Sequence, residues 1–229
     1  MQNIRWHNMD STGEMTTQLA DAICELANSL IREQGSFAIV LAGGNTPRAI
    51  YHKLQHCQTD WSRWHVYFGD ERCLPVGDPD RNDSMAHSTL LDHIPIPAQN
   101  IHAIPAQLPT TQCIADYSAA LENVGEFDLV LLGIGEDGHT ASLFPHHDWG
   151  TTESAPELLA ISDAPKPPSH RISLSAKRLG KARNVWFIVA GENKREVLLR
   201  WQAGEKIPAS AIQPTGNIVD VFYNVSVSH

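Results

Sequence analysis

Two short apolar runs, each followed at once by a glycine-rich turn, restrict the fold of this chain more than any other feature of its sequence. Residues 37–42 and 127–132 are almost continuously apolar, which is typical of strands buried on both faces of a parallel sheet. Helical periodicity separates them from further strand patterns. The other predicted strands span 65–69, 185–190 and 218–222, and the predicted helices run from the Ser11 cap to Gly35, onward from Pro47, and over 84–91, 111–124 and 194–202.

Strands that alternate with helices predict crossover units and a mostly parallel sheet. We therefore expect a Rossmann-like α/β fold of three layers, in which helices flank a mostly parallel sheet. A chain of 229 residues has the length of one large domain or two small ones, and no break in composition marks a boundary. We expect one domain over residues 1–229, with irregular proline-rich connections at 95–109 and 163–169.

Charge and cysteine usage exclude several classes of protein. The chain has 17 Lys and Arg against 26 Asp and Glu, a formal net charge of −9, so nucleic acid and anionic membranes are not expected as partners. The longest apolar stretch is far shorter than the ~20 residues of a membrane span, and residues 1–10 lack the apolar core of a signal peptide. The spacing of Cys24, Cys57, Cys73 and Cys113 suggests neither a zinc site nor a disulfide framework. We expect a reduced, cytoplasmic protein that is a monomer or a small homo-oligomer.

The turn after the first apolar run is a candidate site, because ligands of parallel sheets bind beyond the carboxyl ends of the strands. Gly43 and Gly44 allow a tight turn, and Asn45 and Thr46 lead into a helix that opens near Pro47. Backbone N–H groups and the positive end of that helix would form an anion cradle. The alternative is a tight strand–helix turn in which Asn45 or Thr46 is the N-cap.

Arginines follow the second strand. Arg72 stands just beyond the strand, where a guanidinium can bind a phosphate or a carboxylate through two hydrogen bonds. The alternative is a surface ion pair with Asp70 or Glu71. Arg81 and Asn82 come shortly afterwards, and a solvated polar loop is the default expectation for both.

The glycine-rich turn after the strongest strand carries a histidine. Residues 133–138 match the spacing of a dinucleotide-binding motif, but Glu136 and Asp137 would place carboxylates against the pyrophosphate. The favoured interpretation is a general base, His139, aligned by Asp137, because an imidazole titrates near neutral pH. The alternative is a histidine that caps a following helix.

Cations in the second half of the chain complete the candidate set. Arg171, Ser173 and Ser175 occupy alternate positions, which predicts a strand with one polar face. The basic run 177–183 is expected on a solvated helix face. Lys194 follows the predicted strand at 185–190 and therefore reaches the same edge of the sheet as the other candidates.

Three blocks of the sequence resemble the 6-phosphogluconolactonase branch of the glucosamine-6-phosphate isomerase family in order and spacing. They are residues 41–47 (LAGGNTP), 69–72 (GDER) and 133–145 (GIGEDGHTASLFP). The other matches are Asn82, the segment that begins at Arg171, and the pair Gly191 and Lys194. The resemblance spans nearly the whole chain. One departure is Ala42, where the family often has serine, so backbone N–H groups and Thr46 would supply more of the contacts.

The resemblance implies hydrolysis of 6-phospho-D-glucono-1,5-lactone, a fold shared with glucosamine-6-phosphate isomerase, and no metal or organic cofactor. The expected partner is the small sugar-phosphate lactone itself. As a hypothesis, His139 takes a proton from the attacking water and returns it to the ring oxygen, and Asp137 orients the water or the imidazole. N–H groups of the glycine turn are candidates to bind the oxyanion. The residues expected to hold the substrate are Gly43, Gly44, Asn45, Thr46, Arg72, Asn82, Arg171 and Lys194.

Two other functions stay open. A glucosamine-6-phosphate isomerase or deaminase is disfavoured, because these relatives carry a glutamate after the Gly-His pair whereas residues 140–145 contain no acid. A sugar-phosphate sensor without catalysis would bind 6-phosphogluconate and show no turnover.

Overall fold

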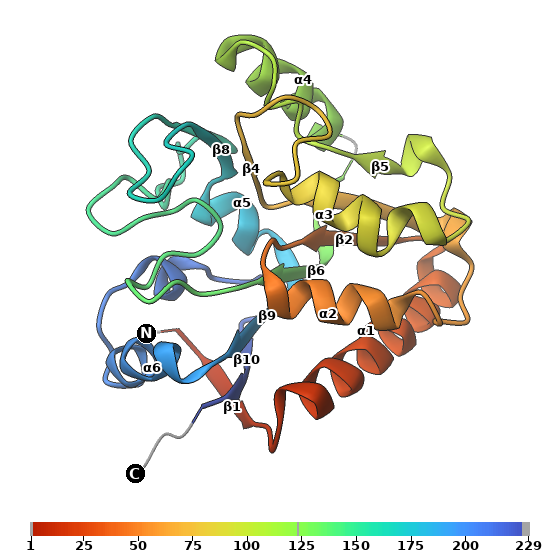
Figure 1. Ribbon diagram of the computed structural model, residues 1–229, viewed down its shortest axis with the longest axis horizontal. Helices are drawn as coiled ribbons and strands as arrows, with labels where there is room; N and C mark the ends of the chain where they lie inside the picture. Colours follow the sequence, from red (N-terminus) through yellow and green to blue (C-terminus); the bar gives the residue numbers. More distant parts are fainter. Residues whose placement is uncertain (1, 123, 226–229) are drawn as a thin grey trace.

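The computed structural model describes residues 2–122 and 124–225, and a seven-stranded sheet lies at its centre. Every neighbouring pair of its strands is parallel (Figure 1). From one edge to the other the strands are β1 (Ile4–Asn8), β10 (Val219–Asn224), β9 (Ala182–Ala190), β6 (Phe127–Leu132), β2 (Phe37–Leu41), β3 (Trp64–Phe68) and β5 (Ile101–His102). Because all seven strands point the same way, their carboxyl ends share one edge of the sheet.

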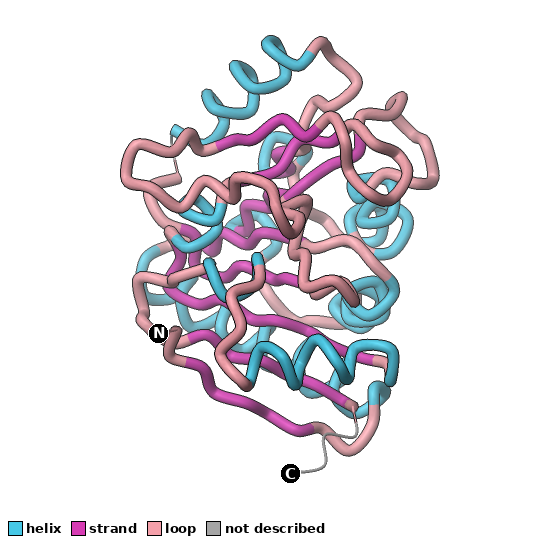
Figure 2. Tube along the Cα trace, turned by 90° about the vertical axis from the view of Figure 1, so that its left-hand side faces the viewer, coloured by secondary structure: helices cyan, strands magenta, loops and turns pink. Residues whose placement is uncertain are grey.

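Helices lie on both sides of this sheet, which gives three layers (Figure 2). They are α1 (Thr12–Gln34), α2 (Asn45–Leu54), α3 (Asn82–Thr89), α4 (Thr110–Glu122), α5 (Ala176–Gly180) and α6 (Arg195–Gln202). The predicted α/β class, with a mostly parallel sheet between helices, is confirmed. None of the helices in the described part of the chain is long and apolar enough to cross a membrane.

Local sequence signals account for the ends and the buried face of α1. The Ser11 hydroxyl accepts a hydrogen bond from the Glu14 N–H at 3.1 Å, which satisfies one free donor of the first turn. Gly35 ends the helix in the left-handed region, at a φ of 88°, which a residue without a side chain adopts at little cost. The apolar positions at helical spacing, such as Leu19, Ile23 and Leu30, are buried against the rest of the core.

A second, smaller sheet stands beyond β3. It pairs β4 (Asp70–Arg72), β8 (Arg171–Leu174) and β7 (Leu158–Ile161) in antiparallel fashion. The sequence predicts only β8, as a strand with one polar face formed by alternate residues. The strand is confirmed, and all four of its residues are buried. Short strands such as β4 carry too few residues to show a periodicity of two.

Two edge strands of the main sheet were also not predicted. β1 lies in the N-terminal segment, and β5 is a two-residue strand inside the proline-rich connection at 95–109. Edge strands are exposed along one side, so their sequences lack the continuous apolar run that marks β2 and β6. Predicted boundaries of the other elements shift by a few residues, as for α3, which begins at Asn82 rather than at Ser84.

The reduced state expected for all four cysteines is wrong for one pair. Cys24 in α1 and Cys57 beyond α2 form a disulfide with their Cα atoms 5.9 Å apart, whereas Cys73 and Cys113 are free thiols. The two bonded cysteines are 33 residues apart in the sequence. Their approach follows from the packing of α1 against α2, which sequence spacing does not reveal.

Candidate active site

A cavity of about 210 Å³ opens where the carboxyl ends of β2, β3 and β6 meet the small sheet. Glycine-rich turns form one side of it, and the start of β8 forms the other. Among the predicted residues, those that line the cavity are Gly43, Gly44, Arg72, Asn82, His139 and Arg171. Topology thus brings residues from five separate segments of the chain to one place.

His139 stands on the turn after β6 and is held by Asp137. Nδ1 of the imidazole lies 2.5 Å from Oδ1 of Asp137, and the same oxygen accepts the backbone N–H of His139 at 3.2 Å. A carboxylate at Nδ1 fixes that nitrogen as the donor, so Nε2 carries the lone pair. Residues 140–157 contain no helix, so the alternative of a helix-capping histidine is wrong.

Gly135 makes this arrangement possible. A methyl group at its Cα would lie 2.0 Å from Nδ1 of His139 and 2.5 Å from Oδ1 of Asp137, both far inside van der Waals contact. The Gly135 N–H also donates to the His139 carbonyl at 2.8 Å. The glycine spacing that resembles a dinucleotide motif therefore serves to seat the imidazole on its own turn.

Burial sets the protonation state of His139. Only 19% of its side chain is exposed, and this desolvation lowers the pKa of the imidazole below its ordinary value. Asp137 and the more distant Asp70 oppose the shift, and Lys166 adds to it. The imidazole is consequently neutral near pH 7, which is the form a general base requires.

Two arginines face each other on the small sheet. Arg72 of β4 and Arg171 of β8 are direct partners in the antiparallel register, so their side chains leave the same face. Like charges in this position repel, unless an anion lies between them. Arg171 is 6% exposed, and its guanidinium donates to the carbonyls of Pro168 and Lys166 at 3.1 and 3.0 Å, contacts that fix it without neutralising its charge.

Arg72 is only partly satisfied by the protein. One of its Nη atoms donates to the Asp80 carbonyl, but its Nε is buried and has no hydrogen-bond partner among the described residues. The alternative ion pair is wrong, because the carboxylates of Asp70 and Glu71 bind other donors. A buried donor without a partner costs about 1–3 kcal/mol, so this side of the cavity is suited to an anion.

The glycine turn after β2 approaches both the cavity and Asn82. Gly44 is the N-cap of α2 at a φ of 106°, so the alternative that places the cap at Asn45 or Thr46 is wrong. A Cβ on Gly43 would lie 2.1 Å from Oδ1 of Asn82, which shows how closely the buried amide packs on the turn. Asn45 is exposed and Thr46 is half-buried on the first turn of α2, outside the cavity lining.

Asp137 and Lys194 stand at the margin. Neither lines the cavity, and Asp137 acts on it through His139. Lys194 ends a short 3-10 turn after β9, where burial lowers the pKa of its ammonium and the nearby Glu136 carboxylate opposes that shift. Lys166 is a second cation close to Lys194; its place in an exposed proline-rich loop gave no sequence signal.

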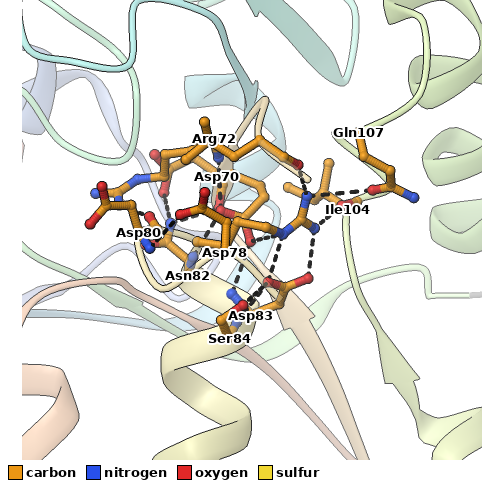
Figure 3. A network of polar contacts seen from close by, with 12 residues as sticks. Asp70, Arg72, Asp78, Asp80, Asn82, Asp83, Ser84, Ile104 and Gln107 are labelled. Atoms are coloured by element: carbon orange, nitrogen blue, oxygen red, sulfur yellow. Dashed lines mark hydrogen bonds and ion pairs between the residues drawn. The ribbon is translucent and has the colours of Figure 1, made fainter. Parts of the chain in front are cut away.

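A buried network of charges fixes the segment that carries Asn82 (Figure 3). The Glu71 carboxylate accepts the N–H groups of Asn82 and Asp83 at 2.8 and 2.9 Å, which are free donors at the start of α3. Arg81 is 2% exposed and pairs with Asp83 through two hydrogen bonds of 2.8 and 2.6 Å. The solvated loop expected for Arg81 and Asn82 is therefore wrong.

The basic run after β8 also differs from expectation at one position. Arg178 is 1% exposed, and its guanidinium lies over the Phe127 ring with 4.1 Å between Cζ and the centroid. It donates to the Val124 carbonyl at 2.9 Å. This arginine joins α5 to the start of β6 and takes no part in the cavity.

Asp70, Thr140 and Ala141 also line the cavity, and the sequence did not single them out as site residues. The expected role of Asp70 was that of an ion-pair partner for Arg72, because nothing in its local sequence distinguishes a buried carboxylate from a surface one. Within residues 2–122 and 124–225, no group of three or more His, Cys, Asp or Glu side chains is placed to hold a metal ion.

Comparison with known proteins places this geometry in a family. The family model for glucosamine-6-phosphate isomerases and 6-phosphogluconolactonases matches residues 10–221. The 6-phosphogluconolactonase of Nostoc sp. is 36% identical over 213 residues, which cover 87% of this chain and 87% of the relative. The solved 6-phosphogluconolactonase of Thermotoga maritima superposes with a TM-score of 0.87 at 25% identity, covering 99% of this chain and 100% of that one.

A longer relative contains a similar region. The GDH/6PGL endoplasmic bifunctional protein of Oryctolagus cuniculus is 35% identical over 218 residues, covering 88% of this chain. The match takes up 27% of that relative, so this chain spans about a quarter of the bifunctional protein's length.

Proposed function

The chain belongs to the glucosamine-6-phosphate isomerase/6-phosphogluconolactonase family, and from this premise we propose that it hydrolyses 6-phospho-D-glucono-1,5-lactone to 6-phosphogluconate with His139 as the general base. Relatives named 6-phosphogluconolactonase match most of the chain, so the chain is a lactone hydrolase of the carboxylic-ester class. The roles of individual residues rest on the geometry of the cavity.

The single observation that carries the proposed chemistry is the His139 imidazole, aligned by Asp137, in the same cavity as Arg72 and Arg171. Nε2 of His139 takes a proton from water while the water oxygen attacks the lactone carbonyl carbon. The tetrahedral intermediate then collapses, the bond from that carbon to the ring oxygen breaks, and the imidazolium returns its proton to the ring oxygen. Asp137 stabilises the imidazolium in between through the 2.5 Å contact at Nδ1.

Charge on the opposite side of the cavity holds the substrate. Arg72 and Arg171 offer a phosphate two guanidinium groups from paired strands, and Lys194 adds a third cation at the margin. This local concentration of positive charge overcomes the repulsion between a dianion and a chain of net charge −9. The N-terminus of α2 at Gly44 reaches the cavity and favours anions, whereas contacts of Asn45 and Thr46 with the substrate stay predictions, since both lie outside the cavity lining.

The test is a lactone hydrolysis assay corrected for spontaneous ring opening, run on the native protein and on His139→Ala. General acid–base catalysis contributes about 100- to 10,000-fold, so the variant should lose at least two orders of magnitude in kcat with an unchanged melting temperature. His52→Ala, on the exposed surface of α2, is the matched control. Normal turnover by His139→Ala would remove the assigned role.

A second assay separates the alternatives. Release of ammonia from glucosamine 6-phosphate would identify a deaminase, and binding of 6-phosphogluconate without any turnover would identify a sensor. Neither is expected. A cytoplasmic location and a monomeric or small homo-oligomeric state stay predictions, which cell fractionation and light scattering test directly.

A further inference from the structure

The turn that follows His139 is strained. Ala141 has a φ of 47°, a left-handed conformation that a residue with a Cβ adopts at a cost. Thr140 and Leu143 close the turn by exchanging backbone hydrogen bonds of 3.3 and 2.9 Å, and the Thr140 hydroxyl donates to the Gly133 carbonyl at 2.8 Å. Such a conformation persists only where neighbouring contacts impose it.

The contacts that impose it come from the small sheet. The Ser142 hydroxyl donates to Oδ2 of Asp70 at 2.5 Å, and the Ser142 N–H donates to the hydroxyl of Ser173 at 3.3 Å. Ser142 and Ser173 are 0% exposed and Asp70 is 7% exposed, so water does not compete for these bonds. One strained residue is therefore followed directly by a residue fixed at two points.

Asp70 uses its other oxygen to hold a second wall of the cavity. Oδ1 accepts the side-chain amide of Asn82 at 3.1 Å, and that amide also donates to the Asp70 carbonyl at 2.9 Å; Figure 3 shows Asp70 and Asn82 within the polar network. Asn82 in turn packs on Gly43. Only a carboxylate can accept at both oxygens, because an asparagine in the same place has a single side-chain acceptor.

We propose that Asp70 is a positioning residue for the reaction: by accepting the Ser142 hydroxyl it holds the strained Ala141–Ser142 turn, and with it His139, against the small sheet. The inference rests on the proposed function, since it assigns His139 the chemical step. The Asp70 carboxylate also acts on the charge of Arg171, so the test that separates turnover from binding is made at Ser142, whose hydrogen bonds go to Asp70 and Ser173. Loss of the Ser142 hydroxyl is therefore expected to reduce turnover and spare substrate affinity.

The clamp is the hydrogen bond from the Ser142 hydroxyl to Asp70. Ser142→Ala tests this clamp without removing a charge. We expect kcat to fall about tenfold, as for loss of a hydrogen bond to a charged group, while the dissociation constant for 6-phosphogluconate stays within about twofold. Ser88→Ala, an exposed serine of α3, is the matched control. A native-like kcat, or an affinity that falls in parallel with kcat, would overturn the proposal.

Ala141→Gly in the Ser142→Ala background gives a readout that a merely structural serine would not move. Glycine adopts a positive φ without strain, so the turn no longer needs the clamp, and the double variant should recover part of the lost kcat relative to Ser142→Ala. Ala141→Gly alone supplies the reference. Failure of the glycine to recover any activity would refute the idea that the clamp opposes strain.

Asp70→Asn separates the clamp from the charge. Asp137, Asp70 and Lys166 are the charged groups that act on the His139 imidazole. Asp70→Asn should lower kcat and also move the acidic limb of the pH profile to lower pH, whereas Ser142→Ala should lower kcat alone. An unshifted limb in Asp70→Asn, or no loss of kcat, would contradict the assigned position. If the native protein shows no lactonase activity, the proposed function itself fails, a result distinct from an active native enzyme with a normal Ser142→Ala variant.

Discussion

The main sheet and the small sheet build opposite sides of the same cavity by different means. On the main sheet, the proposed base His139 and the carboxylate of Asp137 lie two residues apart on one turn, and the glycine that makes room for them is in that turn as well. On the small sheet, Arg72 and Arg171 come from distant parts of the sequence and meet through strand pairing. The geometry of the proposed base is thus set within one turn, whereas the charge proposed to bind the substrate is brought together by strand pairing.

The difference predicts separable effects of mutation. Changes on the turn after β6 should affect the chemical step, because they move the imidazole and leave the arginines untouched. Changes on the small sheet should affect binding, because they remove charge that acts on the substrate in its ground state as well as in the transition state. Asp70 is the exception, since it belongs to the small sheet but acts on the catalytic turn.

The largest expected effect comes from a change in the turn after β6, which holds His139. Gly135→Ala places a methyl group 2.0 Å from Nδ1 of His139, so the imidazole must leave its position. We expect kcat to fall by about 100-fold or more, the lower range for loss of a general base. Steady-state kinetics measures this. Gly125→Ala is the control, because a Cβ at Gly125 would meet open space. A kcat of Gly135→Ala within twofold of native would show that the space at Gly135 is not required for activity.

An intermediate effect is expected for the arginines of the small sheet, which strand pairing brings together. Arg171→Ala should raise KM about tenfold or more, as for loss of charged hydrogen bonds, with a much smaller change in kcat. Arg171→Lys keeps the charge but lacks the planar guanidinium, so its KM should lie between that of the native protein and that of Arg171→Ala. Arg183→Ala, a half-exposed arginine paired with Glu126, is the control. An unchanged KM would exclude Arg171 from the phosphate site.

The smallest expected effect is a shift in the pH dependence of activity, which reports on His139. A general base works when deprotonated, so activity is present above the pKa of His139 and is lost as pH falls through it. Burial places that pKa below its ordinary value of 6.5, and Asp137 opposes the shift. Asp137→Asn should therefore move the acidic limb of the kcat/KM profile to still lower pH.

The matched control for this shift is Glu136→Gln. The Glu136 carboxylate accepts the Asn193 amide at 2.6 Å and is not among the groups that act on His139, so its removal should leave the acidic limb in place. A limb that moves to higher pH in Asp137→Asn would show that the carboxylate does not act on the imidazole as assigned.

Predictions from the sequence succeeded where the signal is local. The Ser11 cap, the Gly35 terminus and the buried strands β2 and β6 were all predicted, because capping and burial leave marks within a few residues. The position of His139 after β6 followed from the same kind of signal. The resemblance to lactonases rests on such blocks and is confirmed by the family match over residues 10–221 together with relatives named 6-phosphogluconolactonase.

Predictions failed where a residue's environment depends on distant segments. Arg81 and Arg178 look like solvated cations in the sequence, but both side chains are buried and hydrogen-bonded. The Cys24–Cys57 disulfide follows from the packing of helices. Asp70 gave no signal as the acceptor of Ser142. Charge and polarity alone do not tell whether a side chain is desolvated, because the groups that surround it are supplied by other parts of the chain.

The sequence by itself determined the alternation of the central strands with helices, the glycine turns at the carboxyl ends of these strands, and the place of His139 two residues after Asp137 on one such turn. Only the tertiary structure decided that Arg72 lies opposite Arg171, that Asn82 packs on Gly43, and that Asp70 accepts the hydroxyl of Ser142 in the turn beyond His139. The physical reason is range. Periodicity, caps and turn preferences act over a few residues, whereas strand pairing and burial of polar groups depend on how the whole chain closes its core.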